Sequence, residues 1–152
     1  MFFNIFLSLS PCLLVPLSPC LLVSLSLLTG CAALKDRLAP PTPLDTGIQI
    51  QYEDPAAWRV EVAGQFNDWK TFPDPKALPL AKNEQGIWTV VIPFRENSKD
   101  NQAYVERGKR YQYKIVINGS SWVEDPNNPL KDTEGGITNS LLIVPERLMG
   151  GK

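Results

Sequence analysis

Histidine is absent from the 152-residue sequence, and cysteine is confined to its first part. Histidine is the commonest general base and metal ligand in proteins, so its absence removes the usual centre of acid–base and zinc chemistry. The three cysteines are Cys12, Cys20 and Cys31. The rest of the chain therefore has no thiolate nucleophile, disulfide or cysteine-built zinc site. We expect no metal and no cofactor.

The net charge is small as well. The net charge is −1 and no basic run stands out, which argues against a nucleic-acid partner. Glycoside hydrolysis needs two carboxylates that face each other across a cleft. Glu124 and Asp125 are sequence neighbours and would point to opposite faces of a strand, and no other pair suggests itself. We therefore expect no catalytic residues and predict that the protein is not an enzyme.

No charged residue precedes Lys35, and this uncharged start is an apolar segment with an eight-residue repeat over residues 9–24. It ends at Leu28-Thr-Gly-Cys31, which resembles the lipobox of bacterial lipoproteins. In that family the chain is cut before the cysteine, and the cysteine is then acylated. The resemblance implies that residues 1–30 are a signal peptide or membrane anchor. It also implies a lipid on Cys31, which would tether the protein to a membrane of the cell envelope.

Other interpretations of this segment stay open. Residues 1–9 lack the positive charge of a normal signal, and the apolar run approaches the ~20 residues that span a bilayer. An uncleaved anchor and a wrongly assigned start codon are the alternatives. Lys35 and Arg37 flank the run on its C-terminal side only, which by the positive-inside rule would keep the domain in the cytoplasm. The lipobox directs the domain outside, and we favour the lipobox.

Short strands and turns dominate the remainder. A proline cluster at 39–43 predicts an extended linker over residues 31–46. Alternating apolar and polar residues then predict strands at 48–52, 58–64, 87–94 and 111–117, with shorter ones at 122–123 and 141–144. This pattern predicts an all-β, immunoglobulin-like β-sandwich over residues 47–146, followed by a tail at 147–152. Trp58 and Trp88 fall within alternating strands, so both are expected in the core.

Several motifs follow one another in this region. They are Gly64-Gln-Phe-Asn-Asp-Trp69, Tyr111-Gln-Tyr-Lys114, Trp122-Val-Glu-Asp-Pro126 and Thr138-Asn139-Ser140. Over residues 56–145 the sequence resembles carbohydrate-binding module family 48, in particular the glycogen-binding domain of the AMP-activated kinase β subunit and isoamylase N-terminal domains. The resemblance implies an immunoglobulin-like fold of the early-set type. It also implies an α-glucan ligand, which would be a glycogen- or starch-like polysaccharide or a maltooligosaccharide.

The resemblance assigns roles to four residues. Trp69 and Trp122 match tryptophans that stack on sugar rings, whereas Lys114 and Asn139 match residues that bind hydroxyls. The residue types fit this chemistry independently, because a glucose ring has an apolar C–H face and a polar hydroxyl rim. We expect the four side chains to converge on one exposed patch. The sequence also departs from the family's leucine and threonine before this asparagine: Gly135 stands in place of the leucine, and the threonine has either become Ile137 or shifted to Thr138.

The sequence leaves two functions open. The first is a non-catalytic α-glucan-binding module tethered to a membrane, with an unidentified glucan-active enzyme as a further partner that is left open. The second is a protein-interaction sandwich of the cell envelope that has lost sugar binding. Exposure of Trp69 and Trp122 on one surface, with Lys114 between them, would favour the first. Burial of either tryptophan would favour the second.

Overall fold

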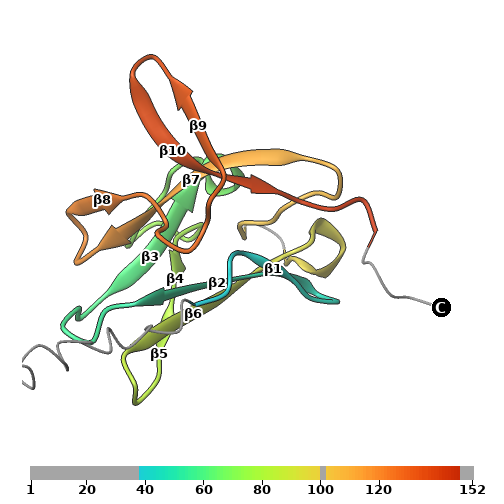
Figure 1. The fold of residues 1–152 in the computed structure, drawn as a ribbon. Helices are drawn as coiled ribbons and strands as arrows, with labels where there is room; N and C mark the ends of the chain where they lie inside the picture. Colours follow the sequence, from blue (N-terminus) through green and yellow to red (C-terminus); the bar gives the residue numbers. More distant parts are fainter. Residues whose placement is uncertain (1–37, 100–101, 148–152) are drawn as a thin grey trace, which may run out of the picture. The chain divides into compact units, whose positions relative to one another are not determined.

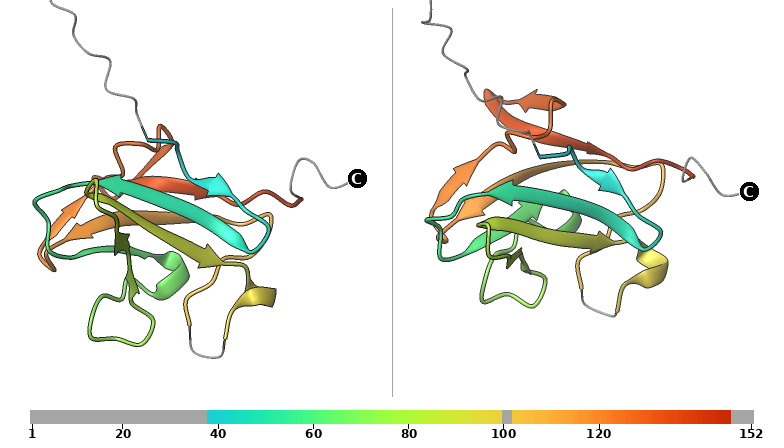
Figure 2. Two further views of the ribbon diagram at one scale, coloured as in Figure 1. Left: turned by 90° about the horizontal axis from the view of Figure 1, so that it is seen from below. Right: turned by 60° about the horizontal axis from the view of Figure 1, so that its bottom comes forward.

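A computed structural model describes residues 38–99 and 102–147 of the chain. The predicted signal segment, Cys31 and residues 148–152 lie outside the described residues. The described part contains ten strands and two short 3-10 helices, η2 (Gln65–Asn67) and η3 (Arg95–Asn97). None of its helices is long and apolar enough to cross a membrane. The strands form two antiparallel sheets that face one another (Figures 1 and 2), which confirms the predicted all-β, immunoglobulin-like sandwich.

The first sheet has four strands. Their order is β1 (Thr42–Pro43), β2 (Gly47–Glu53), β6 (Ile87–Pro93) and β5 (Ala81–Lys82). The edge strand β1 falls within the predicted linker, yet Thr42 pairs with Gln49 and Pro43 with Ile48. Proline has no N–H to donate, so an edge is the position in a sheet that tolerates it.

The second sheet has six strands and carries the predicted motifs. Its order is β4 (Leu78–Pro79), β3 (Val60–Gly64), β7 (Arg110–Ile117), β10 (Ile137–Ile143) and β9 (Lys131–Glu134), and β8 (Ser121–Val123) pairs with the second half of β7. The strands predicted at 48–52, 87–94 and 111–117 correspond to β2, β6 and β7. The two-residue strands β4 and β5 have no alternation to reveal them.

The core lies between the sheets, where strand alternation directs the apolar side chains. Fully or almost fully buried members include Ile48, Ile50, Val60, Val62, Ile92, Tyr113 and Ile115. Burying an aliphatic side chain of this size stabilises the fold by about 1.5–3 kcal/mol relative to leaving it exposed. The residues between them point to the outer face of the second sheet: Glu61 and Ala63 from β3, and Gln112, Lys114 and Val116 from β7.

Of the two tryptophans predicted to lie in the core, one does and one does not. Trp88 is 6% exposed, and its indole N–H donates to the carbonyl of Asp54 at 2.8 Å. Trp58 is 67% exposed, so the prediction for it was wrong. The backbone N–H groups of Trp58 and Arg59 both donate to Asn118 Oδ1, at 3.0 and 3.2 Å. Because Asn118 binds these two N–H groups, regular strand pairing begins only at Val60. Ala57 is buried in the core, where strand alternation had predicted Trp58.

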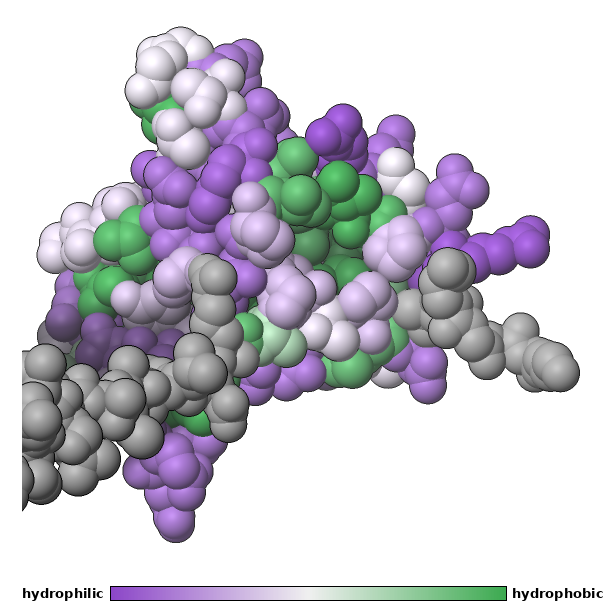
Figure 3. Space-filling model, viewed as in Figure 1, coloured by the Kyte–Doolittle hydropathy of each residue, from purple (hydrophilic) through white to green (hydrophobic). Residues whose placement is uncertain are grey.

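The β9–β10 hairpin projects beyond the sandwich (Figure 1). Gly135 and Gly136 form its turn with φ of +59° and +81°, values that side chains with a Cβ rarely adopt. Hydrophilic atoms cover much of the hairpin, whereas hydrophobic residues gather where β10 continues across the sandwich (Figure 3). The first half of β10 has an exposed Ile137 followed by three polar residues, Thr138, Asn139 and Ser140, so it shows no apolar alternation and the strand was predicted only from residue 141.

Candidate functional site

The register of the second sheet places the predicted site residues on its outer face. Lys114 on β7 lies opposite Ala63 on β3, and Trp122 on β8 lies opposite Val116 on β7. Residues that face each other in an antiparallel pair share one face of the sheet. The pairing of Ser140 with Tyr113 puts the preceding residue, Asn139, beside Lys114 on that same face. The sheet therefore positions three of the four predicted residues, and a loop must supply Trp69.

Trp69 reaches Trp122 from the loop that follows β3. The two ring centroids lie 6.5 Å apart, with 40° between the ring planes. Trp122 is 42% exposed and Trp69 is half-buried. In the part of the chain that the structure describes, neither indole N–H has a hydrogen-bond partner. The pair thus forms an open aromatic surface with two inclined planes.

Asn67 builds the loop that carries Trp69. Its Oδ1 accepts the Gly64 N–H at 2.9 Å, and its Nδ2 donates to the carbonyls of Lys70 at 2.9 Å and of Val62 and Lys76 at 3.2 Å. This buried amide replaces the regular backbone pairing that the loop lacks. The asparagine of the Gly64–Trp69 motif therefore has a structural role.

The backbone at Trp69 itself is strained. Asp68 and Trp69 have φ of 55° and 58°, the left-handed region that few residues with a Cβ occupy. Aspartate tolerates this region better than a bulky aromatic does. The Trp69 N–H donates to the Gly64 carbonyl at 2.9 Å, which closes the turn. Strained residues of this kind cluster at functional sites, because the surrounding structure must hold them in place.

Asp125 anchors the loop after Trp122. Its Oδ2 accepts the Tyr113 hydroxyl at 2.6 Å, and its backbone N–H donates to Ser140 Oγ at 2.8 Å. Asn128 Nδ2 in turn donates to the Tyr113 oxygen at 3.1 Å. Burial, reinforced by the Asp125 charge, raises the pKa of Tyr113 well above its ordinary value, so the hydroxyl stays a donor. The Asp-Pro pair of the Trp122–Pro126 motif thus fixes the chain just behind the exposed tryptophan.

Lys114 is half-buried beside the tryptophan pair, on the polar side of β7. No described residue accepts a hydrogen bond from its ammonium or forms an ion pair with it. Two other lysines of the domain form ion pairs: Lys76 pairs with Asp68 at 2.6 Å, and Lys131 pairs with Glu124 at 3.2 Å. Lys114 therefore offers three N–H donors that the protein itself does not use.

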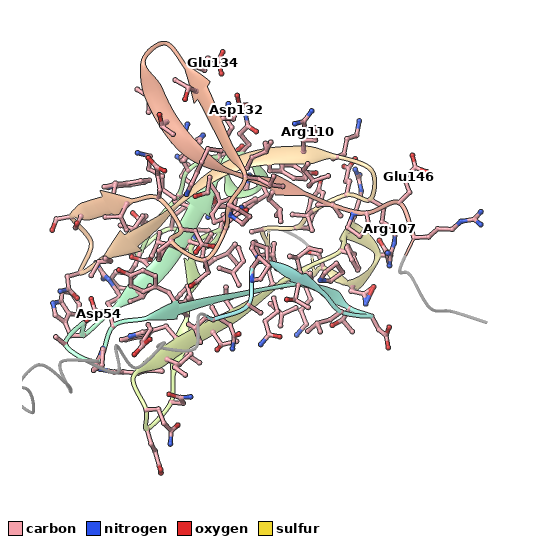
Figure 4. All side chains as sticks on the ribbon, viewed as in Figure 1. Asp54, Arg107, Arg110, Asp132, Glu134 and Glu146 are labelled. Carbon is pink, nitrogen blue, oxygen red and sulfur yellow. The ribbon has the colours of Figure 1, made fainter. Side chains whose placement is uncertain are left out.

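Asn139 differs from the exposed residue that we expected. It is 6% exposed, and its Nδ2 donates to Gln112 Oε1 at 2.9 Å. Gln112 Nε2 then donates to Asp132 Oδ2 at 3.0 Å, and Asp132 and Glu134 both lie on strand β9 of the hairpin (Figure 4). The chain Asn139–Gln112–Asp132 ties the hairpin to the sheet. Only Asn139 Oδ1 is left to accept a hydrogen bond from a ligand.

A second aromatic cluster on this face was missed from the sequence. It consists of Trp58, 67% exposed, and Phe72, 64% exposed, both of which lie close to the Arg59 guanidinium. The Arg59 Cζ lies 4.8 Å from the Trp58 ring centroid and 5.3 Å from that of Phe72. Strand alternation had assigned Trp58 to the core, and Phe72 stands in a loop without periodicity. The adjacent pair Trp58-Arg59 was the one sequence signal that could have pointed to it.

A sandwich with paired, partly exposed tryptophans and an unpaired lysine on one sheet face has the features of a sugar-binding module. Residues 40–128, more than half of the chain, match the model of carbohydrate-binding module 48, the isoamylase N-terminal domain. The chain belongs to this family, as its motifs predicted. The matched region includes Trp69, Lys114 and Trp122 and ends before Asn139. A search of curated proteins found no match to the chain.

Proposed function

We propose that this chain is a non-catalytic α-glucan-binding module tethered to a membrane. The observation that carries the proposal is the contact between Trp69 and Trp122, with 6.5 Å between the ring centroids and 40° between the planes. Consecutive glucose units of an α-glucan lie on a curve, so their apolar faces do not share a plane. Two inclined indole rings suit such a ligand, and each ring provides a large apolar surface with little rotamer entropy to lose.

Lys114 supports the same ligand class. Its ammonium has no partner among residues 38–99 and 102–147, and Lys114 is half-buried next to the tryptophan pair, so it can donate to sugar hydroxyls without first breaking an ion pair with any of these residues. The neighbouring Asn139 Oδ1 can accept, although its burial restricts it to a ligand group that enters closely. One donor and one acceptor beside an apolar platform match the hydroxyl rim and the C–H face of a glucose unit.

The two carboxylates that follow Trp122 in the chain support a role without catalysis. Asp125 is 1% exposed and engaged by Tyr113, and Glu124 pairs with Lys131 at 3.2 Å. A glycosidase needs two carboxylates that flank the scissile bond across a cleft. Among the described residues there is also no group of three or more His, Cys, Asp or Glu side chains that could hold a metal ion.

Membrane tethering rests on the sequence alone. The Leu28–Cys31 segment has the small residues that a signal peptidase needs before a cysteine that can be acylated, and it follows a long apolar run. The prolines between Cys31 and β1 would hold the sandwich away from the membrane surface as a semi-rigid spacer. We further propose that the protein lies in the cell envelope and that it cooperates there with a glucan-active enzyme.

Binding of the purified full-length protein to glycogen, maltoheptaose and β-cyclodextrin tests the glucan proposal. The detergent must carry no maltose headgroup, because such a headgroup would compete for the site. Cellohexaose is the matched control ligand, since it has the same glucose units in a straight chain. We expect binding to the three α-glucans and none to cellohexaose. Equal binding to cellohexaose would remove the argument from the inclined rings.

The alternative function, an envelope interaction module without sugar binding, is favoured by three specific features. Asn139 is buried, Gly135 leaves the hairpin tip without a side chain, and Ile137 beside it is 60% exposed. A folded protein that retains none of the three α-glucans would establish this alternative in place of the glucan-binding function.

A further inference from the structure

Trp58, Arg59 and Phe72 form the second aromatic cluster on the outer face of the second sheet, and the sugar site described above does not use it. Both aromatic side chains are more exposed than Trp122, at 67% and 64% against 42%. Large aromatic side chains left in water at such exposure indicate a binding surface more often than a packing accident. The question is whether they belong to the tryptophan pair or to a separate surface.

The sheet register connects the two groups. Trp122, Val116 and Glu61 form one row across β8, β7 and β3. Neighbouring strands are ~4.8 Å apart, so this row places the Trp122 and Glu61 backbones about 10 Å from one another. At the Glu61 end, the Phe72 N–H donates to Glu61 Oε1 at 2.7 Å. Phe72 therefore stands at the other end of the row that begins with Trp122, and Trp69 lies three residues before it in the same loop.

Arg59 continues the same face by one step along β3. The Asn118 N–H donates to the Arg59 carbonyl at 2.8 Å, which extends the β3–β7 register by one row. Arg59 therefore shares the outer face with Glu61 and Ala63. Alternate residues on one face of a strand are about 6.7 Å apart, so the rows from Ala63 to Arg59 cover about 13 Å along the strand. Trp58 lies at the far end of this length.

Glu61 holds the second cluster in place. Its carboxylate is completely buried, and its Oε2 lies 3.2 Å from Arg59 Nε in an ion pair. Its other oxygen binds the Phe72 backbone. A buried carboxylate is costly unless it is paired, so its presence between the two groups fixes both the guanidinium and the loop. Trp58 and Phe72 then both lie close to a guanidinium that Glu61 holds, with ring centroids 4.8 and 5.3 Å from Arg59 Cζ.

We propose that Trp58 and Phe72 extend the glucan site, so that one sugar chain runs from Lys114 and the tryptophan pair past Phe72 to Trp58. The inference rests on the proposed glucan function and adds a determinant of chain length to it. The occupant is the same neutral glucan, because Glu61, which holds the second cluster, lies in one row of the sheet with Val116 and Trp122. Arg59 adds guanidinium donors for hydroxyls between the two outer rings. Short glucans contact only the tryptophan pair, whereas longer glucans also contact Phe72 and Trp58.

The test compares maltotriose and maltoheptaose by calorimetry with the full-length wild-type protein and the double variant Trp58→Ala/Phe72→Ala. Wild-type protein is expected to bind maltoheptaose more tightly than maltotriose. In the double variant the affinity for maltoheptaose should fall by roughly tenfold, while the affinity for maltotriose stays unchanged. A loss of roughly tenfold corresponds to about half of the free energy gained by burying one large apolar side chain. Val91→Ala is the matched control, since Val91 is 38% exposed on β6 of the other sheet.

Each of the following outcomes would contradict the proposal that Trp58 and Phe72 extend the glucan site. Unchanged affinity for both sugars in the double variant would show that the second cluster makes no glucan contact. Equal weakening for both sugars, with an unchanged melting temperature, would show that the cluster acts through the tryptophan pair and not as added length. A wild-type protein that binds neither sugar would overturn the glucan function and the extension together, and this result is distinct from the other two.

Discussion

Trp69 from a loop and Trp122 from strand β8 are more than fifty residues apart in the chain, and their ring centroids lie 6.5 Å apart on one face of a sheet. Each is positioned by a buried polar residue close by in the sequence: Asn67 for Trp69, and Asp125 for Trp122. The motifs that reveal the family therefore each combine one exposed or half-buried tryptophan with one buried polar residue that builds the loop beside it. This division of roles separates the effects that we expect from mutation.

Replacement of either tryptophan of the pair should remove most of the binding. Trp69→Ala or Trp122→Ala takes away one apolar plane, and we expect a loss of roughly 1.5–3 kcal/mol, or about 10- to 150-fold in affinity. Retention on glycogen and calorimetry with maltoheptaose measure this loss. Ile143→Ala is the control, because Ile143 is 48% exposed on β10. Full retention of glycogen by the double tryptophan variant would place the site elsewhere.

Removal of the Lys114 ammonium should have a smaller effect. Lys114→Gln loses donors toward the hydroxyl rim, and we expect affinity to fall by about 1 kcal/mol, close to fivefold. Because the ligand is neutral, binding by the wild-type protein should change little between low and high salt. A steep salt dependence would instead indicate a polyanionic ligand, and an unaffected variant would show that Lys114 does not reach the sugar.

The tryptophans should also divide by stability. Trp88 is almost fully buried and hydrogen-bonded, so Trp88→Ala should lower the free energy of unfolding by roughly 3–5 kcal/mol. Trp122→Ala should cost much less, since 42% of that residue is already exposed. Urea denaturation of the two variants measures the difference. Equal losses would show that Trp122 stabilises the sandwich and does not serve primarily as a binding surface.

Tyr113 should make the fold sensitive to alkali. Its pKa is raised above the ordinary 10.0 by burial and by the Asp125 charge, so above pH 10 the unfolded chain loses this proton while the folded chain keeps it. The unfolded state then binds fewer protons than the folded state, and stability falls as the pH rises from about 10. Below pH 10, Tyr113→Phe should cost about 1–3 kcal/mol, because Asp125 and Asn128 lose their buried partner.

The alkaline loss should be weaker in Tyr113→Phe than in the wild-type protein, because the variant lacks the titrating hydroxyl. Urea denaturation at pH 8 and at pH 10.5 measures both effects. Identical alkaline slopes for the two proteins would mean that Tyr113 does not govern this sensitivity.

Acylation of Cys31 is the test of the membrane tether. Cys31→Ser should leave an unprocessed precursor without incorporated lipid, since serine cannot form the thioether. Metabolic labelling with a fatty acid and the intact mass of the extracted protein report the two effects. Stable attachment needs at least two acyl chains, so the wild-type mass should exceed that of the cleaved chain accordingly. Equal mass and labelling in both proteins would exclude the lipoprotein proposal.

Local patterns in the sequence were sufficient for the sandwich and for its family. The alternation in β2 and β7 depends only on which face of a strand each side chain takes, and that property follows from the backbone itself. The order of the motifs indicated Trp69, Lys114 and Trp122 as candidate sugar-binding residues, and all three lie near one another on the outer face of the second sheet. The sequence did not predict β1 at residues 42–43 or the strands β4 and β5. Each has only two residues, which is too short to show a strand alternation.

Tertiary contacts decided the rest. Trp58 lies outside the core because Asn118, about sixty residues away in the sequence, accepts the backbone N–H groups of Trp58 and Arg59, which would otherwise have continued β3. Asn139 became buried because Gln112 on the neighbouring strand takes its amide. The position of Phe72 depends on the buried Glu61 carboxylate, which faces outward from a strand yet is covered by the loop. Each of these outcomes rests on a hydrogen bond between residues that are distant in the sequence, and no local pattern encodes such a bond.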